Sequence, residues 1–407
     1  MAEISPLQLL IFRHTEDMDA SVYEEAILSA FQGGTETGGY LPIGEDIGIP
    51  TKIFREFPRL EQTIAQLLDS TCHTTTVVIV DDALLGKGSD DLWDWLAECW
   101  THTSTSNYRH SMIAIAMDER VGLRFTRKRP VFASLQLLHV HELGEKAMRP
   151  ATLALRIVHE GRLVLARGLP ISTPSGHHPG YLRLFISHAK YDGLPLAHAL
   201  KFQIQQFNWL RSFYDAADLP AGCDWERELE VGVGSSLIIM LRTEAYEHRY
   251  WCQQEVLWAE KYATPAVLVD ARIGLQHPSG FLPFDRVPSV RIPDGNLMRI
   301  LFLALREGLR FLLFKRRVEQ LKINGMLPNP VELKVFSYAP GMSALLSACQ
   351  ALVTSSEPPT TPRMILYPDP PFRAGLYEAA HALVSVYCPD ARLVTPDTLA
   401  ATKGVVP

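Results

Sequence analysis

Three strand-length apolar runs, each followed by polar and loop-forming residues, lie close together between Leu182 and Glu255. They read, in chain order, LRLFISHAKYDG, RSFYDAADLPAGCDW and SSLIIMLRTEAYEHRYWCQQE. An apolar run of about four to eight residues bounded by turn residues is typical of a buried strand. Strands that alternate with helices form a parallel sheet, which binds ligands at the carboxyl ends of its strands. The alternation therefore predicts an α/β domain with its site at that edge.

The whole central region, 181–322, follows this rhythm. Strands are expected at 182–187, 209–215, 236–243, 265–270 and 289–292. Helices are expected at about 195–206, 225–233, 250–262 and 296–321. Asp224 is expected to cap the second of these helices, and Ser187 or Asp192 the first. Five strands alternating with helices predict a flavodoxin-like doubly wound parallel sheet.

The N-terminal region, 1–168, repeats the plan. The segments that match central strands are LQLLIFRHTED (7–17), TTVVIVDDALL (75–85), MIAIAMD (112–118) and LQLLHV (135–140). DLWDWLAECW (91–100) matches the helix that begins at Tyr250. If Trp93 corresponds to Trp251, then Ala97, or Glu98 after a shift, takes the place of Glu255. We expect a second flavodoxin-like domain that lacks this acid. A true internal repeat and the rhythm shared by any two such domains both stay open.

The C-terminal region, 332–407, predicts a small βαβαβ unit with strands at 333–340, 363–369 and 391–395. It is too short to bury a full doubly wound core, so we expect it to pack on the rest of the chain or on a partner. Segments rich in proline, glycine and small polar residues, at 169–180 and 324–332, are expected to be linkers between the three regions.

Composition limits the classes of function. The formal net charge of −6 gives no general attraction to nucleic acid or anionic membranes. Six scattered cysteines without a CxxC pair indicate reduced, buried thiols and neither disulfides nor a metal site. The start, MAEISPLQLL, lacks the basic segment of a signal peptide, and no apolar run is long enough to span a bilayer. We expect a cytoplasmic protein without a metal, a membrane contact or direct binding to nucleic acid.

The three central blocks resemble the Toll/interleukin receptor (TIR) domain in its bacterial and plant forms. The combination of FISHAKYD, FYDAADLPAGCDW and YEHRYWCQQE carries the resemblance, which covers 181–322, about a third of the chain. It implies a TIR domain there and a TIR-like fold for 1–168. The chain departs from the family pattern at Arg242, Thr243 and Arg249, where related sequences often have small hydroxyl residues.

Many TIR domains cleave NAD⁺, with a glutamate at the position of Glu255. The resemblance therefore implies NAD⁺ as the substrate and no cofactor. Because the departing nicotinamide is already a good leaving group, cleavage of its bond to ribose needs no strong general acid, unlike paired-carboxylate glycosidases. It needs one carboxylate to stabilise developing positive charge and an apolar slot that excludes water. Spacing alone would indicate an ordinary surface glutamate in a first helical turn.

Further candidates for substrate binding lie at the expected strand ends and helix starts: Phe185, Ser187, His188, Tyr214, Asp215, Trp225 and Trp251. Each has a structural alternative. Phe185 fits a core position, Ser187 a helix cap, and the tryptophans packing anchors. Nothing near His188 forms a Ser–His–Asp arrangement, and Cys252 is interpreted as a packing residue because no basic partner accompanies it.

The segment 216–222, AADLPAG, corresponds to the loop through which TIR domains contact one another and gate their pocket. Leu219 is the expected apolar anchor, and Pro220 and Gly222 set the shape of this assembly loop.

The resemblance thus implies an NAD⁺ nucleosidase, or an ADP-ribosyl cyclase, that acts as the effector of a bacterial antiphage immune system. Self-association through TIR domains would activate it, with a sensor protein or a nucleotide signal as the trigger. The alternative is a non-enzymatic TIR scaffold that acts by homotypic contacts. A nucleoside transferase-like enzyme on a related fold is a third hypothesis, against which the Trp251–Cys252 pair argues.

Overall fold

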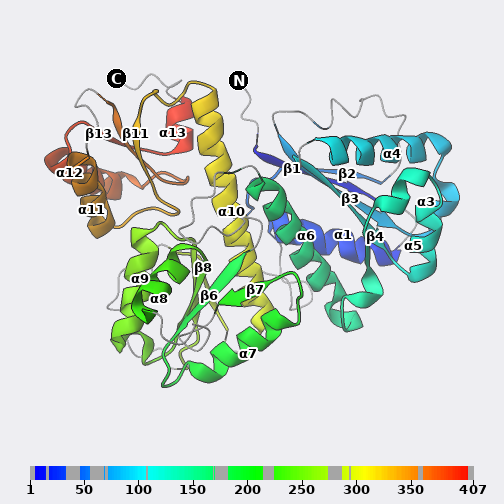
Figure 1. The fold of residues 1–407 in the computed structure, drawn as a ribbon, viewed down its shortest axis with the longest axis horizontal. Coiled ribbons are helices and arrows are strands. Elements are labelled where there is room, and N and C mark those ends of the chain that lie inside the picture. The colour runs from blue at the N-terminus through cyan, green and yellow to red at the C-terminus, as the bar shows by residue number, and fades with distance from the viewer. Residues whose placement is uncertain are drawn as a thin grey trace. The chain divides into compact units, whose positions relative to one another are not determined.

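The computed structural model describes residues 5–14, 18–33, 46–55, 68, 72–106, 109–167, 169, 182–213, 224–273, 287–292, 295–355 and 361–401. These residues form an α/β protein with three sheets in which every paired strand runs parallel to its neighbour (Figure 1). The chain divides into two compact units, Met1–Pro170 with Met298–Leu313 and Ile171–Leu297 with Phe314–Pro407. Among the helices that the structure describes, none combines the length and apolar character needed to cross a bilayer.

The first unit contains a sheet in the order β2-β1-β3-β4-β5. Its strands are β1 (Leu7–Phe12), β2 (Thr51–Phe54), β3 (His73–Val80), β4 (His110–Ala116) and β5 (Leu137–His139). The helices between and after them are α1 (Met18–Gln32), α3 (Asp82–Lys87), α4 (Asp90–Thr105), α5 (Glu119–Thr126) and α6 (Arg149–Ala166). This strand order is that of flavodoxin-like sheets, with which the unit is compatible. The sequence did not predict β2, a short strand whose residues are only half-buried or exposed.

Local sequence explains the elements of this unit. In β3, HTTTVVIV, β-branched residues fill a strand that is buried along nearly its whole length. Helix α4 begins where the Ser89 side chain accepts a hydrogen bond from the Leu92 amide. Its buried face includes Trp93, Trp95 and Cys99. This face packs against residues of β1, β3 and β4 on the sheet. The expected strand–helix rhythm of the N-terminal region is thus confirmed.

A buried carboxylate ties α1 to the ends of β1 and β2. Glu24 is 3% exposed and pairs with Arg13, which follows β1, and with Arg55, which follows β2. Burial alone would raise the pKa of Glu24, but hydrogen bonds from Arg55 and Arg13 outweigh it and hold the pKa below its ordinary value. The ionised carboxylate therefore stabilises the fold above its unfolded pKa, and this stability is lost as the pH falls through the folded value.

Glu24→Gln is expected to destabilise the first unit by about 3–5 kcal/mol at pH 7, because it leaves the buried Arg13 without its charge partner. Thermal unfolding of the variant and the unchanged protein at pH 7 and at pH 4 measures this. The difference between them should shrink at the lower pH, because Glu24 of the unfolded chain begins to bind protons there and the advantage of the ionised folded form starts to be lost. Glu25→Gln, a change at the neighbouring exposed residue, is the matched control and should have little effect. An equal loss in both variants would contradict the role of the pair.

The central sheet lies in the second unit, in the order β10-β9-β8-β6-β7, the same topology as the first sheet. Its strands are β6 (Arg183–His188), β7 (Arg211–Phe213), β8 (Leu237–Arg242), β9 (Ala266–Asp270) and β10 (Ser289–Arg291). Its helices are α7 (Leu194–Gln205), α8 (Trp225–Gly234) and α9 (Tyr250–Lys261). Helix α10 (Leu297–Ile323) follows β10, and its residues Met298–Leu313 belong to the first unit. The five expected strands and four expected helices are confirmed, although β7 is shorter than predicted. Asp224 caps α8 as expected, accepting a hydrogen bond from the Arg227 amide.

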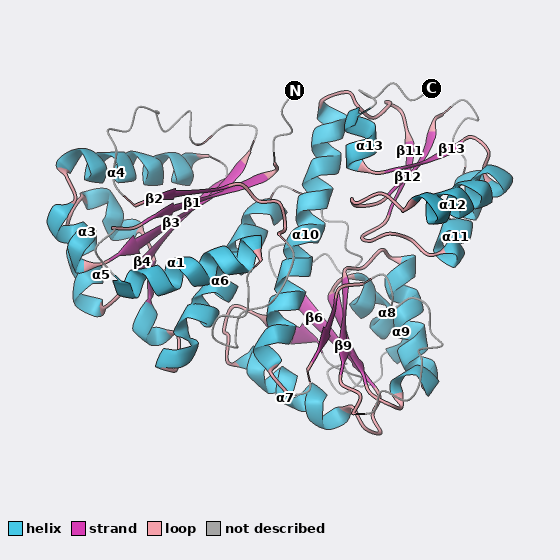
Figure 2. Cartoon of the chain, turned by 180° about the vertical axis from the view of Figure 1, so that it is seen from behind, coloured by secondary structure: helices cyan, strands magenta, loops and turns pink. Residues whose placement is uncertain are grey.

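The C-terminal residues form a sheet in the order β11-β12-β13, with the expected βαβαβ succession. Its elements are β11 (Glu332–Val335), α11 (Met342–Val353), β12 (Arg363–Leu366), α12 (Ala374–Tyr387), β13 (Ala391–Val394) and α13 (Pro396–Ala401). Helices α11 and α12 pack on one face (Figure 2). The other face packs on α13 and on Phe314, Val318 and Leu321 near the end of α10. The prediction that this unit packs on the rest of the chain is confirmed.

The cysteines behave as predicted where the structure describes them. Five are buried thiols that form no disulfide: Cys72, Cys99, Cys252, Cys349 and Cys388. Cys223 lies outside the described residues.

Candidate active site

A pocket opens at the carboxyl end of β6, between the loop that follows this strand and helices α8 and α9. Its volume is about 770 Å³, within the range of about 300–1,000 Å³ typical of small-molecule sites. It is lined by Phe185, Ile186, His188, Ala189, Lys190, Tyr191, Trp225, Leu229, Arg249, Trp251, Cys252 and Glu255. The site expected at this edge of the sheet thus has a real cavity. Of the predicted residues, the pocket brings together Glu255, Phe185, His188, Trp225 and Trp251.

The acid of the pocket, Glu255, is half-buried in the second turn of α9. It therefore lies beyond the first turn, where a helix dipole favours negative charge most. Ser187, at the end of β6, is 1% exposed and donates a hydrogen bond from Oγ to Glu255 Oε2. The hydroxyl of Tyr246 lies 2.5 Å from the same Ser187 Oγ. Ser187 is thus placed behind the carboxylate and does not line the pocket.

One wall of the pocket is aromatic. The rings of Trp225 and Trp251 meet edge to face with centroids 4.4 Å apart. The ring centroid of Tyr250 lies 4.9 Å from that of Trp251. Trp258, which is 8% exposed, anchors the group in the core. Trp225 itself is 42% exposed, so part of its ring remains available to a ligand. Such a wall offers flat, apolar faces to a planar ring.

The rim of the pocket is cationic, which the sequence did not reveal. Lys190 and Arg249 are both exposed lining residues, and they come from different loops, after β6 and before α9. The Arg249 guanidinium lies 5.6 Å from the ring centroid of Tyr191, which is 81% exposed. The only sequence signal was the departure from the family pattern at Arg249. Two cations beside an exposed ring suit a ligand with phosphate groups.

The loops around the pocket are tied together by Asp192. Its carboxylate accepts hydrogen bonds from Thr243 Oγ1 at 2.7 Å and from the Ala245 amide at 2.9 Å. The expected capping role of Asp192 or Ser187 is wrong, because Gly193 is the N-cap residue of α7, this helix has no side-chain cap, and both side chains bond elsewhere. The loop that follows β6 is therefore fixed to the loop that follows β8.

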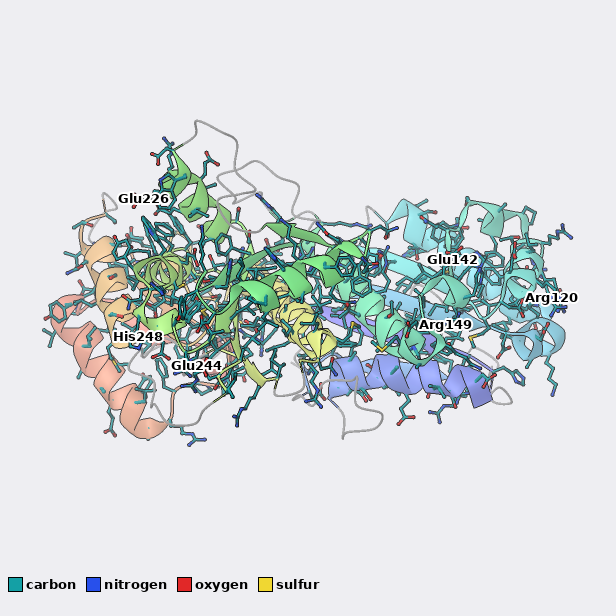
Figure 3. All side chains as sticks on the ribbon, turned by 90° about the horizontal axis from the view of Figure 1, so that it is seen from below. Arg120, Glu142, Arg149, Glu226, Glu244 and His248 are labelled. Atoms are coloured by element: carbon teal, nitrogen blue, oxygen red, sulfur yellow. The ribbon has the colours of Figure 1, made fainter. Side chains whose placement is uncertain are left out.

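Two of the residues that depart from the TIR pattern, Arg242 and Thr243, have partners in the structure. Arg242 is buried and forms an ion pair with Glu247, while Thr243 donates to Asp192. Glu244, labelled in Figure 3, accepts a hydrogen bond from the Ile273 amide at 2.8 Å, which ties the segment after β8 to the end of β9. The bonds of Arg242, Thr243 and Glu244 therefore brace the segment that leads into α9.

His188 and Cys252 do not present a nucleophilic site. His188 is 9% exposed, and its Nδ1 lies 3.2 Å from the Ile186 carbonyl oxygen. Burial raises the pKa of the Cys252 thiol well above its ordinary value, and the negative charge of Glu255 adds to the rise. A thiol that holds its proton this firmly is a poor nucleophile, which agrees with the interpretation of Cys252 as a packing residue.

The remaining sequence-predicted residues, Tyr214, Asp215, Leu219, Pro220 and Gly222, lie outside the described residues.

The corresponding edge of the N-terminal sheet is filled by aromatic rings. Phe12 aligns with Ser187. Its ring stacks on that of Phe54 with centroids 4.5 Å apart, and its centroid lies 5.0 Å from that of Trp95. Trp95 is the sixth residue of α4, as Glu255 is of α9, and it contacts Phe12 as Glu255 contacts Ser187. The structural counterpart of the acid is therefore Trp95 and not Ala97, which packs against the core. Glu98 is exposed.

Comparison with known proteins identifies no family. No protein-family model matches the chain, and a search of curated proteins finds no match either.

Proposed function

We propose that the chain is a TIR-type NAD⁺ nucleosidase that cleaves the bond between nicotinamide and ribose. The observation that carries this proposal is the half-buried Glu255 carboxylate in the wall of an aromatic pocket at the carboxyl end of β6. The flavodoxin-like strand order of the central sheet supports the TIR assignment.

The pocket supplies what this reaction requires. Loss of nicotinamide leaves positive charge on the ribose, which a fixed carboxylate such as Glu255 stabilises without reorganisation. The faces of Trp225 and Trp251 can hold a planar ring and exclude water from the reacting bond. Lys190 and Arg249 suit the diphosphate that links the two halves of NAD⁺.

The biological role belongs to the same proposal. An enzyme that destroys NAD⁺ suits a cytoplasmic effector of antiphage immunity, silent until TIR domains assemble. The N-terminal sheet, with the same strand order and an edge filled by Phe12, Phe54 and Trp95, fits a TIR-like domain without a reaction of its own.

Incubation of the purified protein with NAD⁺ over a range of protein concentrations, followed by chromatography and mass measurement, tests the activity. Nicotinamide should appear together with ADP-ribose or a cyclised form. Self-association without any product would favour the non-enzymatic TIR scaffold. Transfer of the ribosyl group to an added base, in place of hydrolysis or cyclisation, would favour the nucleoside transferase-like enzyme.

One NAD⁺ molecule is expected to bind per chain, because Phe12, Phe54 and Trp95 occupy the N-terminal counterpart of the pocket. Equilibrium dialysis of the full chain carrying Glu255→Gln measures the stoichiometry without turnover. Trp225→Ala in the same background should weaken this binding, since it removes one face of the aromatic wall. A second equivalent of bound NAD⁺ that survives Trp225→Ala would show that the N-terminal sheet also binds the dinucleotide.

A further inference from the structure

A buried tyrosine hydroxyl stands behind the carboxylate of the pocket. Tyr246 is 1% exposed and belongs to the hydrophobic core around Phe185 and Cys252. A buried hydroxyl is costly unless it is hydrogen-bonded, and this one lies 2.5 Å from Ser187 Oγ. Ser187 in turn donates to Glu255. Three separate elements, namely the turn after β8, strand β6 and helix α9, thus contribute to one chain of hydrogen bonds.

The chain of hydrogen bonds has a defined direction. An ionised carboxylate only accepts hydrogen bonds, so the single hydroxyl hydrogen of Ser187 is used in the hydrogen bond that it donates to Glu255. The lone pairs of Ser187 Oγ then accept from the Tyr246 hydroxyl. Burial raises the pKa of Tyr246 well above its ordinary value, so this hydroxyl keeps its proton near neutral pH. Each donor thus points toward the carboxylate.

The tyrosine is itself held in place by the backbone. It begins the short turn Tyr246–His248, whose last residue is labelled in Figure 3. Its amide donates to the Thr243 carbonyl at 3.3 Å, and its carbonyl accepts from the Arg249 amide at 3.2 Å. Asp192 fixes the residues just before it, by accepting from Ala245 and Thr243. A hydroxyl on such a braced turn can hold its partner at one position.

We propose that Tyr246 and Ser187 are positioning residues, which hold the Glu255 carboxylate in the orientation that the reaction requires. This inference rests on the proposed cleavage of NAD⁺. Neither residue lines the pocket, so both act through Glu255 and not by touching the substrate. Their loss should therefore change kcat and leave KM nearly unchanged.

The first test is Tyr246→Phe, which removes the hydroxyl and keeps the buried ring. Because a small misplacement of a catalytic group costs up to about 10²-fold in rate, we expect kcat to fall by about 10- to 100-fold. Tyr262→Phe is the matched control, since it removes a hydroxyl that donates to Glu230 at 2.7 Å outside the pocket. That control should leave kcat and KM unchanged.

The second test is a double-mutant cycle with Ser187→Ala. If Tyr246 acts through Ser187, then Tyr246→Phe should have no further effect on kcat in the Ser187→Ala protein. Additive losses would indicate a general structural role and overturn the proposal, as would full kcat in Tyr246→Phe. Should Tyr246→Phe fail to fold, Ser187→Thr decides, because it must retain more of kcat than Ser187→Ala. An unchanged protein that does not cleave NAD⁺ would instead refute the proposed function itself.

Discussion

Glu255→Gln is expected to lower kcat for NAD⁺ cleavage by about 10²–10³-fold or more, because it removes the charge that stabilises the ribosyl cation. Glutamine has nearly the same shape, and its side-chain oxygen can still accept the hydrogen bond from Ser187. The fold and the affinity for NAD⁺ should therefore persist. Steady-state kinetics, with calorimetry as a check on folding, measure both.

Glu226→Gln provides the matched control for this substitution. Glu226 is an exposed acid on α8, labelled in Figure 3, that does not line the pocket. The substitution Glu226→Gln should leave kcat unchanged. Near-normal turnover in Glu255→Gln would remove Glu255 from the reaction, and an equal loss in both variants would point to a general effect of surface charge.

Leu219→Asp is expected to reduce activity by about 10²-fold, if assembly through the segment 216–222 completes the pocket. An unpaired charge buried in an interface costs several kcal/mol, and about 2.8 kcal/mol already shifts an association equilibrium 10²-fold. In the unchanged protein, specific activity should rise with protein concentration. Kinetics at several concentrations, combined with sedimentation, measure assembly and activity together.

The same substitution at Leu123, which is 55% exposed on α5, tests whether an added aspartate is harmful in itself. Leu123→Asp should keep the concentration dependence of the unchanged protein. Activity strictly proportional to concentration, and equal in Leu219→Asp, would exclude control by assembly.

The sequence predicted most strands of the two larger sheets because their apolar runs are continuous. Strand β8, LIIMLR, is buried throughout, and such a run has few other conformations open to it. The strand β2 was missed because TKIF offers no such pattern, and it pairs with β1 at the edge of the sheet. Its place is set by the neighbouring strand and not by its own residues.

The candidate site was predictable only where one segment carried the information. Glu255 and Trp251 belong to one helix, and Phe185 lies within one strand, so a motif could indicate them. The cationic rim consists of Lys190 and Arg249, residues distant in the chain that line the same pocket because β6 and β8 pair in the sheet. The bonds from Asp192 to Thr243 and Ala245 arise in the same way, from pairing that no local pattern records.

The close packing of Phe12, Phe54 and Trp95 means that the two larger sheets face different constraints on their sequences. Functional sites carry polar and exposed groups that a fold optimised for stability would not keep. The central sheet keeps such an edge, whereas the N-terminal sheet closes the same edge with close-packed rings. Substitutions that stabilise the N-terminal sheet are therefore not limited by the needs of a pocket. Substitutions at the corresponding edge of the central sheet are limited in this way.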